Sequence, residues 1–262
     1  MQYLPRRALM CALVLAAVPF AHAGVESIST QVDHVDYDHA RGSRDVAGLA
    51  VAGRAGDTRW QLEAAHGHRD FGDTAFSGSR VGASLHHDWS RYLSTRTSAT
   101  FSDDSPVFAN RDISQDLMFK VLPNTVLSVG GRYAEYYGNT YLSGWSAGAQ
   151  YYFPRVSASY RYSRHHLSSG GSGHGNTLML RLQDAQGRGS SQLWLGSGTS
   201  AYVPDMDPLL LRDTRSRSVF LRRNQPLGEH LMLNVGIGKA WHETTFERFS
   251  GVSSHVGLGY RW

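Results

Sequence analysis

Cysteine is almost absent from this chain of 262 residues, and the single one, Cys11, lies in a segment that we expect to be removed. The first residues carry two arginines, then a short apolar run, and then Ala-His-Ala at 21–23. This order is typical of a secretory signal peptide, so we predict that residues 1–23 are cleaved off before Gly24. The mature chain then holds no cysteine, which excludes disulfides and thiolate metal sites.

Long hydrophobic runs are also missing after residue 23. A membrane-spanning helix needs about 18 or more consecutive apolar residues, and no such stretch occurs there. Proline is sparse at 8 residues and charged residues make up only 18%, whereas glycine reaches 28 residues and aromatic residues 11%. The lack of long apolar runs argues against a helical membrane protein, and the composition argues against an ordinary soluble globular protein.

What the chain does have is a period of two. Leucines at 178, 180 and 182 alternate with polar or flexible side chains, and the apolar residues at 231–237 follow the same rule. Segments of about ten residues with this alternation, separated by turn residues, are typical of transmembrane strands. We predict an all-β fold for residues 24–262, a transmembrane antiparallel up-and-down β-barrel of about 14 strands in the outer membrane. Twelve strands is the alternative if the first two weak segments pair differently.

The connections between these segments alternate in length. Short turns such as those at 55–58 and 122–125 should lie on the periplasmic side, and longer polar stretches should lie outside. The longest stretch, around 200–216, carries three consecutive leucines (Leu209, Leu210 and Leu211). It could fold into the barrel mouth as a partial plug or dock on a partner.

The two faces of each strand meet different surroundings. Apolar residues can face lipid, whereas the small and polar residues of the other face need water or partners and should line the lumen. Aromatic residues collect near strand ends, as interfacial girdles require. We expect four of them to be interface anchors: Trp60, Trp89, Tyr260 and Trp262.

Several stretches resemble YaiO-family outer-membrane β-barrel proteins. They are VLPNTVLSVGGRY in the middle of the chain and NQPLGEHLMLNVGIGKAWHE and SSHVGLGYRW near its end. The resemblance runs from about Ala75 to Trp262 and fades in the residues before Ala75. It implies an outer-membrane location. The family is similar to the C-terminal barrels of exopolysaccharide secretion porins, which suggests glycan passage by analogy.

Arginines on the polar face are the candidate lumen-lining residues. The binding candidates are Arg96, Arg132, Arg161 and Arg181, with the acids Glu63 and Asp116. Excess positive charge in a narrow lumen would favour anions, including acidic sugars. Alternatively, these arginines pair with the acids and stiffen or plug the wall. The sequence leaves both readings open.

Histidines form short clusters that invite a chemical interpretation. His66 and His68 share a strand face, and the run His86-His87-Asp88 could supply part of a catalytic triad. Neither cluster reproduces a known active-site segment. We therefore expect no catalytic residue, no metal site and no cofactor.

The function expected from these features is a channel or porin-like protein that passes polar solutes or exopolysaccharide. The alternatives are an outer-membrane enzyme acting on lipid or glycan and a structural or surface-interaction barrel. The expected partners are outer-membrane lipid and lipopolysaccharide, a glycan, and the barrel-assembly machinery through the C-terminal strand, with no nucleic acid. Basic residues near the outer rim should contact lipopolysaccharide phosphates: Arg41, Arg44, Arg212, Arg215 and Arg217.

Overall fold

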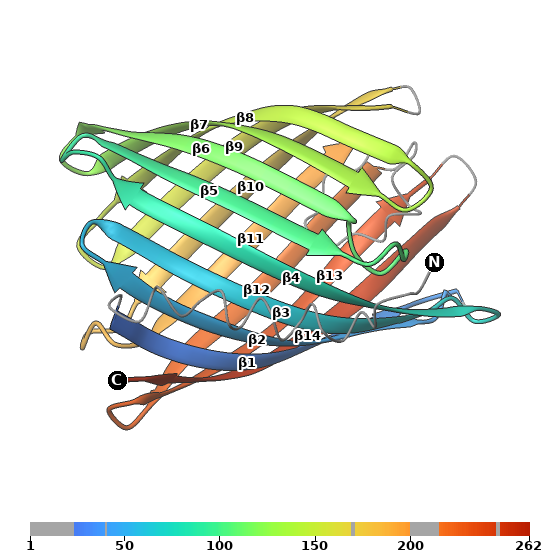
Figure 1. The fold of residues 1–262 in the computed structure, drawn as a ribbon, viewed down its shortest axis with the longest axis horizontal. Coiled ribbons are helices and arrows are strands. Elements are labelled where there is room, and N and C mark those ends of the chain that lie inside the picture. The colour runs from blue at the N-terminus through green and yellow to red at the C-terminus, as the bar shows by residue number, and fades with distance from the viewer. Residues whose placement is uncertain (1–23, 40, 169–170, 200–214, 245–246) are drawn as a thin grey trace, which may run out of the picture.

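The structure is a computed structural model that describes residues 24–39, 41–168, 171–199, 215–244 and 247–262. The described residues form one antiparallel sheet that closes on itself as a barrel (Figure 1). The fourteen strands are β1 (Gly24–Tyr37), β2 (Ser43–Ala55), β3 (Thr58–Asp70), β4 (Ala75–Asp88), β5 (Leu93–Ser102), β6 (Arg111–Leu122), β7 (Thr125–Tyr136), β8 (Thr140–Tyr152), β9 (Val156–Leu167), β10 (Ser172–Gln183), β11 (Ser190–Thr199), β12 (Arg215–Leu227), β13 (Leu231–Glu243) and β14 (Arg248–Arg261). The predicted barrel of 14 strands is confirmed, and the alternative of twelve is wrong. The predicted leader lies outside the described residues, none of which forms a helix long and apolar enough to cross a membrane.

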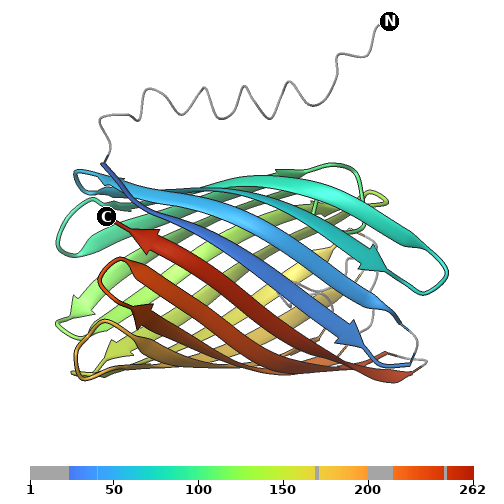
Figure 2. The same cartoon turned by 90° about the horizontal axis from the view of Figure 1, so that it is seen from below.

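The barrel closes between its first and last strands. β14 pairs with β1 from Ser27↔Arg261 to Tyr37↔Gly251, so the two ends of the sheet share a continuous ladder (Figure 2). The last residue also takes part, because the Trp262 amide donates to the Glu26 carbonyl at 3.2 Å. Closure removes both sheet edges, and with them the unpaired backbone groups that lipid cannot satisfy.

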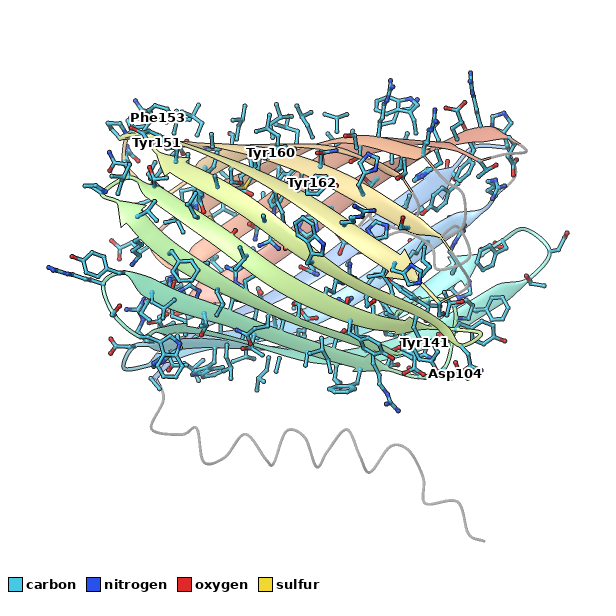
Figure 3. The ribbon with its side chains drawn as sticks, turned by 90° about the horizontal axis from the view of Figure 1, so that it is seen from above. Asp104, Tyr141, Tyr151, Phe153, Tyr160 and Tyr162 are labelled. Atoms are coloured by element: carbon cyan, nitrogen blue, oxygen red, sulfur yellow. The ribbon has the colours of Figure 1, made fainter. Side chains whose placement is uncertain are left out.

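Side chains alternate between lipid and lumen as the period of two requires. On β10, Leu178, Leu180 and Leu182 share the outward face, while Met179 and Arg181 point inward. Figure 3 shows the outward side chains around the whole barrel, with Tyr151 and Phe153 at one end and Tyr141 at the other. Aromatic residues thus occur at both ends of the apolar band, as an anchored membrane barrel requires.

The connections are shorter than the sequence suggested. The residues around 165–175 have the polar, glycine-rich composition of a loop, yet they belong mostly to β9 and β10, which continue to Leu167 and restart at Ser172. Strands can extend beyond the apolar band because outward polar side chains pair across them, as His66 does with Ser79 at 3.0 Å. We call this end of the barrel the long-loop end, and the opposite end, which holds Gly24 and Trp262, the short-turn end.

The β5–β6 connection, residues 103–110, folds into the barrel. Val107 and Phe108 are buried and pack with Val46 of β2 and Ala65 of β3. Gly67 leaves the space that this loop needs, since a Cβ added there would lie 2.7 Å from the Val107 side chain. The sequence had left residues 200–216 as either a partial plug or a docking segment, and most of that stretch lies outside the described residues.

Candidate functional site in the barrel lumen

The lumen contains two hollows against different parts of the wall. The first hollow measures about 480 Å³ and lies against β1, β2 and β10–β14, with Phe108 on its border. The second hollow measures about 450 Å³ and lies against β5–β9. Both volumes fall within the range of small-molecule sites, roughly 300–1,000 Å³.

Ion pairs dominate the wall of the second hollow. Arg132 holds Asp112 through two nitrogens, with Nε–Oδ1 at 3.0 Å and Nη2–Oδ2 at 2.6 Å. Arg161 contacts Asp116 at 3.1 Å and donates to the Ser146 hydroxyl at 3.1 Å. Two of the predicted lumen arginines therefore lie in the lumen but are neutralised by carboxylates of β6.

The same pairing holds for most other carboxylates of the lumen wall. Glu63 contacts Arg80 at 3.4 Å, and Asp88 contacts Arg59 at 3.3 Å near the short-turn end. Asp112, which the sequence analysis did not single out, is the partner of Arg132. In these pairs, adjacent strands place the acid beside a base. Each acid is then neutralised by its own arginine and does not cancel the charge of the arginines that have no partner.

Three lumen arginines stand apart from these pairs. Among the described residues, the side chains of Arg96, Arg181 and Arg222 have no hydrogen-bond or ion-pair partner. Arg96 borders the second hollow and Arg222 the first. The structure therefore divides the predicted lumen arginines into paired and unpaired members, and both readings of the sequence hold for different residues.

A row of lumen-facing positions crosses the sheet beside the first hollow, which its members Asp33, Arg222 and His255 line. The strand registers align Arg181 with Gln192, Gln192 with Arg222, and Arg222 with Gly236. The row continues from Gly236 to His255 and from there to Asp33 across the barrel seam. We call Arg181, Arg222 and His255 the basic row; each member is two strands from the next, roughly 10 Å.

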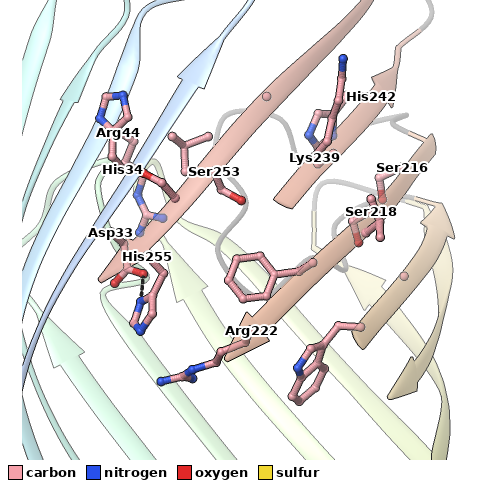
Figure 4. Close-up of a pocket in the computed structure, with 18 of the residues that line it drawn as sticks. Asp33, His34, Arg44, Ser216, Ser218, Arg222, Lys239, His242, Ser253 and His255 are labelled. Atoms are coloured by element: carbon pink, nitrogen blue, oxygen red, sulfur yellow. Dashed lines mark hydrogen bonds and ion pairs between the residues drawn. The ribbon is translucent and has the colours of Figure 1, made fainter. Parts of the chain in front are cut away.

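His255 is fixed by Asp33. Its Nδ1 lies 2.6 Å from Asp33 Oδ1, and its side chain is only 7% exposed. The Nε2 atom on the other side of the ring is buried without a partner among the described residues. Figure 4 shows Asp33, His255 and Arg222 along this wall. Because Asp33 orients the ring, Nε2 is the nitrogen left for a ligand.

An aromatic side chain covers part of the same wall. Phe220 of β12 lies over two glycines of β13: a Cβ at Gly236 would lie 2.6 Å from its ring, and one at Gly238 would lie 2.5 Å from it. Trp194 is its cross-strand neighbour on β11 and also lines the first hollow. The sequence analysis missed Phe220, Trp194, Asp33 and His255. The alternation could have placed them inward, but only the closed register brings them together.

The histidine clusters do not assemble into a catalytic or metal site. His66 and His68 point outward, and each bonds a serine of β4 at 3.0 Å. His86 and His87 face opposite sides of β4; the first lies 3.4 Å from Asp88 and the second 2.8 Å from the Thr58 hydroxyl. No group of three metal-ligating side chains occurs among the described residues.

The expected interface anchors lie on the outward face or at the turns of the short-turn end. Trp89 and Trp262 are 65% and 63% exposed, and the Tyr260 and Trp262 rings are 5.3 Å apart. Trp60 lies against Gly53, where an added Cβ would be 2.5 Å from its ring.

One residue of the expected lipopolysaccharide contact is misplaced. Arg44 is buried in the lumen, where it donates to the Val107 carbonyl at 3.4 Å, so its assignment to the outer rim is wrong. Arg215 and Arg217 do lie on the outward face of β12 near the long-loop end. Arg212 lies outside the described residues. Arg44 turns inward because it shares a register position with lumen-facing Val35.

Comparison with known proteins gives one family and several structures of the same fold. The sequence matches the family model described as the YaiO membrane beta barrel domain over residues 25–203. The match includes the strands before residue 75, where the resemblance of short motifs fades, and ends before the motifs near the C-terminus.

Two solved structures of similar shape are a channel and a secretin. The CymD monoaromatic hydrocarbon channel is similar with a TM-score of 0.64 and 9% identity, covering 92% of this chain and 89% of that one. A bacterial polysaccharide outer membrane secretin has a TM-score of 0.54 and 8% identity, covering 90% and 98%. At such identities the likeness extends to the fold alone.

Proposed function

The chain belongs to the YaiO family of outer-membrane β-barrels, and from that premise we propose that it is a channel for small polar solutes that prefers anions. The observation that carries the proposal is the set of lumen arginines without a partner among the described residues: Arg96, Arg181 and Arg222. The paired acids contribute little net field, whereas unpaired guanidinium groups raise the local concentration of anions in a narrow space.

The inward loop supports a selective channel. Phe108 borders the first hollow and is flanked by two guanidinium groups, with Arg80 5.0 Å and Arg44 5.6 Å from its ring centroid. A lumen narrowed in this way brings a solute close to the wall, where charged and hydroxyl groups can select it.

A planar-bilayer experiment tests the proposal. In a salt gradient the wild-type channel should show a reversal potential on the anion-selective side, and the double variant R181Q/R222Q should move it towards zero. The control is R217Q, which removes an arginine from the outward face of the same strand and should leave the potential unchanged. The absence of conductance above background would overturn the proposal.

Passage of a glycan is the second candidate function. Hydroxyl side chains of Ser98, Thr100, Ser114, Ser146 and Ser163 line the second hollow beside the arginines, a mixture suited to sugar hydroxyls. Uptake of neutral and acidic oligosaccharides into liposomes that contain the protein tests it. Exclusion of both classes would contradict glycan passage while leaving ion conduction intact.

The route to the membrane is also a proposal. We propose that a leader of residues 1–23 is cleaved, that β14 engages the assembly machinery, and that Arg215 and Arg217 contact lipopolysaccharide phosphates. The mass of the protein isolated from membranes tests the cleavage: a chain that begins at Gly24 is expected, and one that retains Met1 contradicts it. We expect no enzymatic activity, and incubation with phospholipid and lipopolysaccharide checks this.

A further inference from the structure

The wall of the first hollow carries more specific features than anion preference requires. Arg222 has a buried Nε atom without a partner, and His255 has a buried Nε2 atom in the same condition among the described residues. Both belong to the basic row, and only Gly236, which has no side chain, stands between them. The two residues therefore flank Gly236 on the lumen face of the sheet, and the Phe220 ring lies over that glycine.

Unsatisfied polar nitrogens in a buried wall are rare, because each loses its hydrogen bond to water. Here the Asp33 carboxylate at 2.6 Å from Nδ1 fixes the His255 ring. With Nδ1–H donated to Asp33, Nε2 is the acceptor that the ring keeps, and it suits a ligand hydroxyl. The guanidinium group of Arg222 matches a carboxylate, which accepts through two oxygens.

The aromatic surface beside Arg222 indicates what the carboxylate is attached to. Phe220 precedes Arg222 by two residues on β12, so both side chains share the lumen face. The glycines at 236 and 238 let its ring lie along the wall. A ring held in this way offers a stacking platform to a ligand.

Hydroxyl groups surround the platform. Ser218 lies two residues before Phe220 on the same face, and Ser253 is adjacent to Gly238 on β14. Hydroxyl donors and acceptors next to an aromatic face suit the polar edge and apolar face of a pyranose. A benzene ring has no groups that could form hydrogen bonds with them.

We propose that Arg222, His255 and Phe220 form a binding subsite for a pyranose sugar that bears a carboxylate, a uronic acid. Arg222 binds the carboxylate, Phe220 stacks on the sugar ring, and Ser218, Ser253 and the His255 Nε2 atom bond its hydroxyls. The inference rests on the proposed function, since it takes the first hollow to be reached by solutes from the lumen.

Isothermal titration calorimetry on the full-length protein in detergent micelles tests the subsite without requiring conduction. Sodium glucuronate should bind, and glucose should bind at least about tenfold more weakly because it lacks the charge-assisted bonds. R222Q should lower glucuronate affinity about tenfold or more, H255A should weaken glucuronate and glucose alike, and R217Q should match wild type. F220L, which keeps the bulk but not the aromatic face, should weaken both sugars while retaining the native heat-modified gel mobility.

Three results would overturn the subsite. They are equal affinities for glucuronate and glucose, unchanged glucuronate affinity in R222Q, and tighter binding of benzoate than of glucuronate, which would assign the platform to an aromatic acid. The bilayer experiment keeps the two proposals separate. Glucuronate binding without anion-selective conduction would overturn the channel proposal alone. Conduction without glucuronate binding would overturn the subsite proposal alone.

Discussion

The two hollows of the lumen differ in how their arginines are used. In the second hollow Arg132 and Arg161 are tied to Asp112 and Asp116 on β6. In the first hollow Arg222 has no partner among the described residues, and the one carboxylate nearby, Asp33, is taken by His255. Both walls are polar and of similar size, yet two arginines of the second are neutralised by β6 carboxylates, with Arg96 unpaired on its border, whereas Arg222 of the first keeps its charge for a ligand.

The difference teaches that the number of lumen arginines is a poor guide to selectivity. A paired guanidinium group orients neighbouring strands and contributes little field at a distance, while an unpaired one attracts counter-ions. The paired wall should respond to mutation through stability, and the unpaired wall through selectivity.

The largest effect is expected from reversing the charge of the unpaired wall. The double variant R181E/R222E changes the lumen by four charges without breaking an ion pair among the described residues. We expect the channel to change from anion to cation preference, measured as a change of sign of the reversal potential in a salt gradient. A variant that stays anion-selective would show that these arginines do not face the conduction path.

The paired wall should behave in the opposite way. In R132Q/D112N both members of a pair are removed and the net lumen charge is unchanged, so ion preference should persist. R132Q alone leaves a half-buried carboxylate without its two-point partner and should lower unfolding stability by roughly 1–3 kcal/mol, more than the double variant does. Urea titration followed by tryptophan fluorescence measures the free energy of unfolding of both variants. If R132Q and the double variant lose the same stability, the pair is not coupled.

The inward loop offers a way to enlarge one hollow alone. F108A removes a ring that borders the first hollow and packs with Val46, which should weaken docking of the loop by roughly 3 kcal/mol and raise single-channel conductance. F101A, on the outward face of β5, is the matched control and should not change conductance. Unaltered conductance in F108A would mean that the loop does not limit flow.

The smallest effect is expected at the seam that closes the first-hollow wall. Burial raises the pKa of Asp38, but hydrogen bonds from His39 and from the amide and hydroxyl of Ser250 outweigh it and lower the pKa to about 2. The depressed pKa means that the contact stabilises the fold above pH 4 and is lost as pH falls through 2. The contribution of this contact to Tm should therefore be nearly the same at pH 7 and pH 4 and smaller at pH 2.

The variant D38N isolates this contribution. It lacks the carboxylate at every pH, so its Tm should lie slightly below that of wild type at pH 7, and the two should converge near pH 2. Since Asp38 is largely exposed, the difference is expected to be small. A gap that persists at pH 2 would assign the effect to packing instead of charge.

Much of the fold was predictable from local patterns. The period of two placed Leu180 and Leu233 outward and Arg96, Arg132, Arg161 and Arg181 inward, because a side chain's face depends only on its parity within a strand. The lengths of loops were less predictable. The polar residues around 165–175 look like a loop, but outward polar side chains are equally at home on strands that continue into water.

The candidate site was predictable only in part. That Arg161 points inward follows from the sequence, whereas its pairing with Asp116 three strands away depends on strand tilt and side-chain reach. The link between Asp33 and His255 joins residues 222 positions apart, and only the closing register decides it. The inward course of residues 103–110 likewise depends on the space left at Gly67 by a strand that precedes the loop.

By itself the sequence determined an antiparallel barrel of about 14 strands with an apolar exterior and an arginine-rich interior. Alternation and turn spacing are local properties that do not depend on which strands pair. Which arginines keep their charge was decided by the tertiary structure alone. Closing the sheet fixes every cross-strand neighbour at once, and an ionised side chain inside a barrel is free or neutralised according to the neighbour that closure gives it.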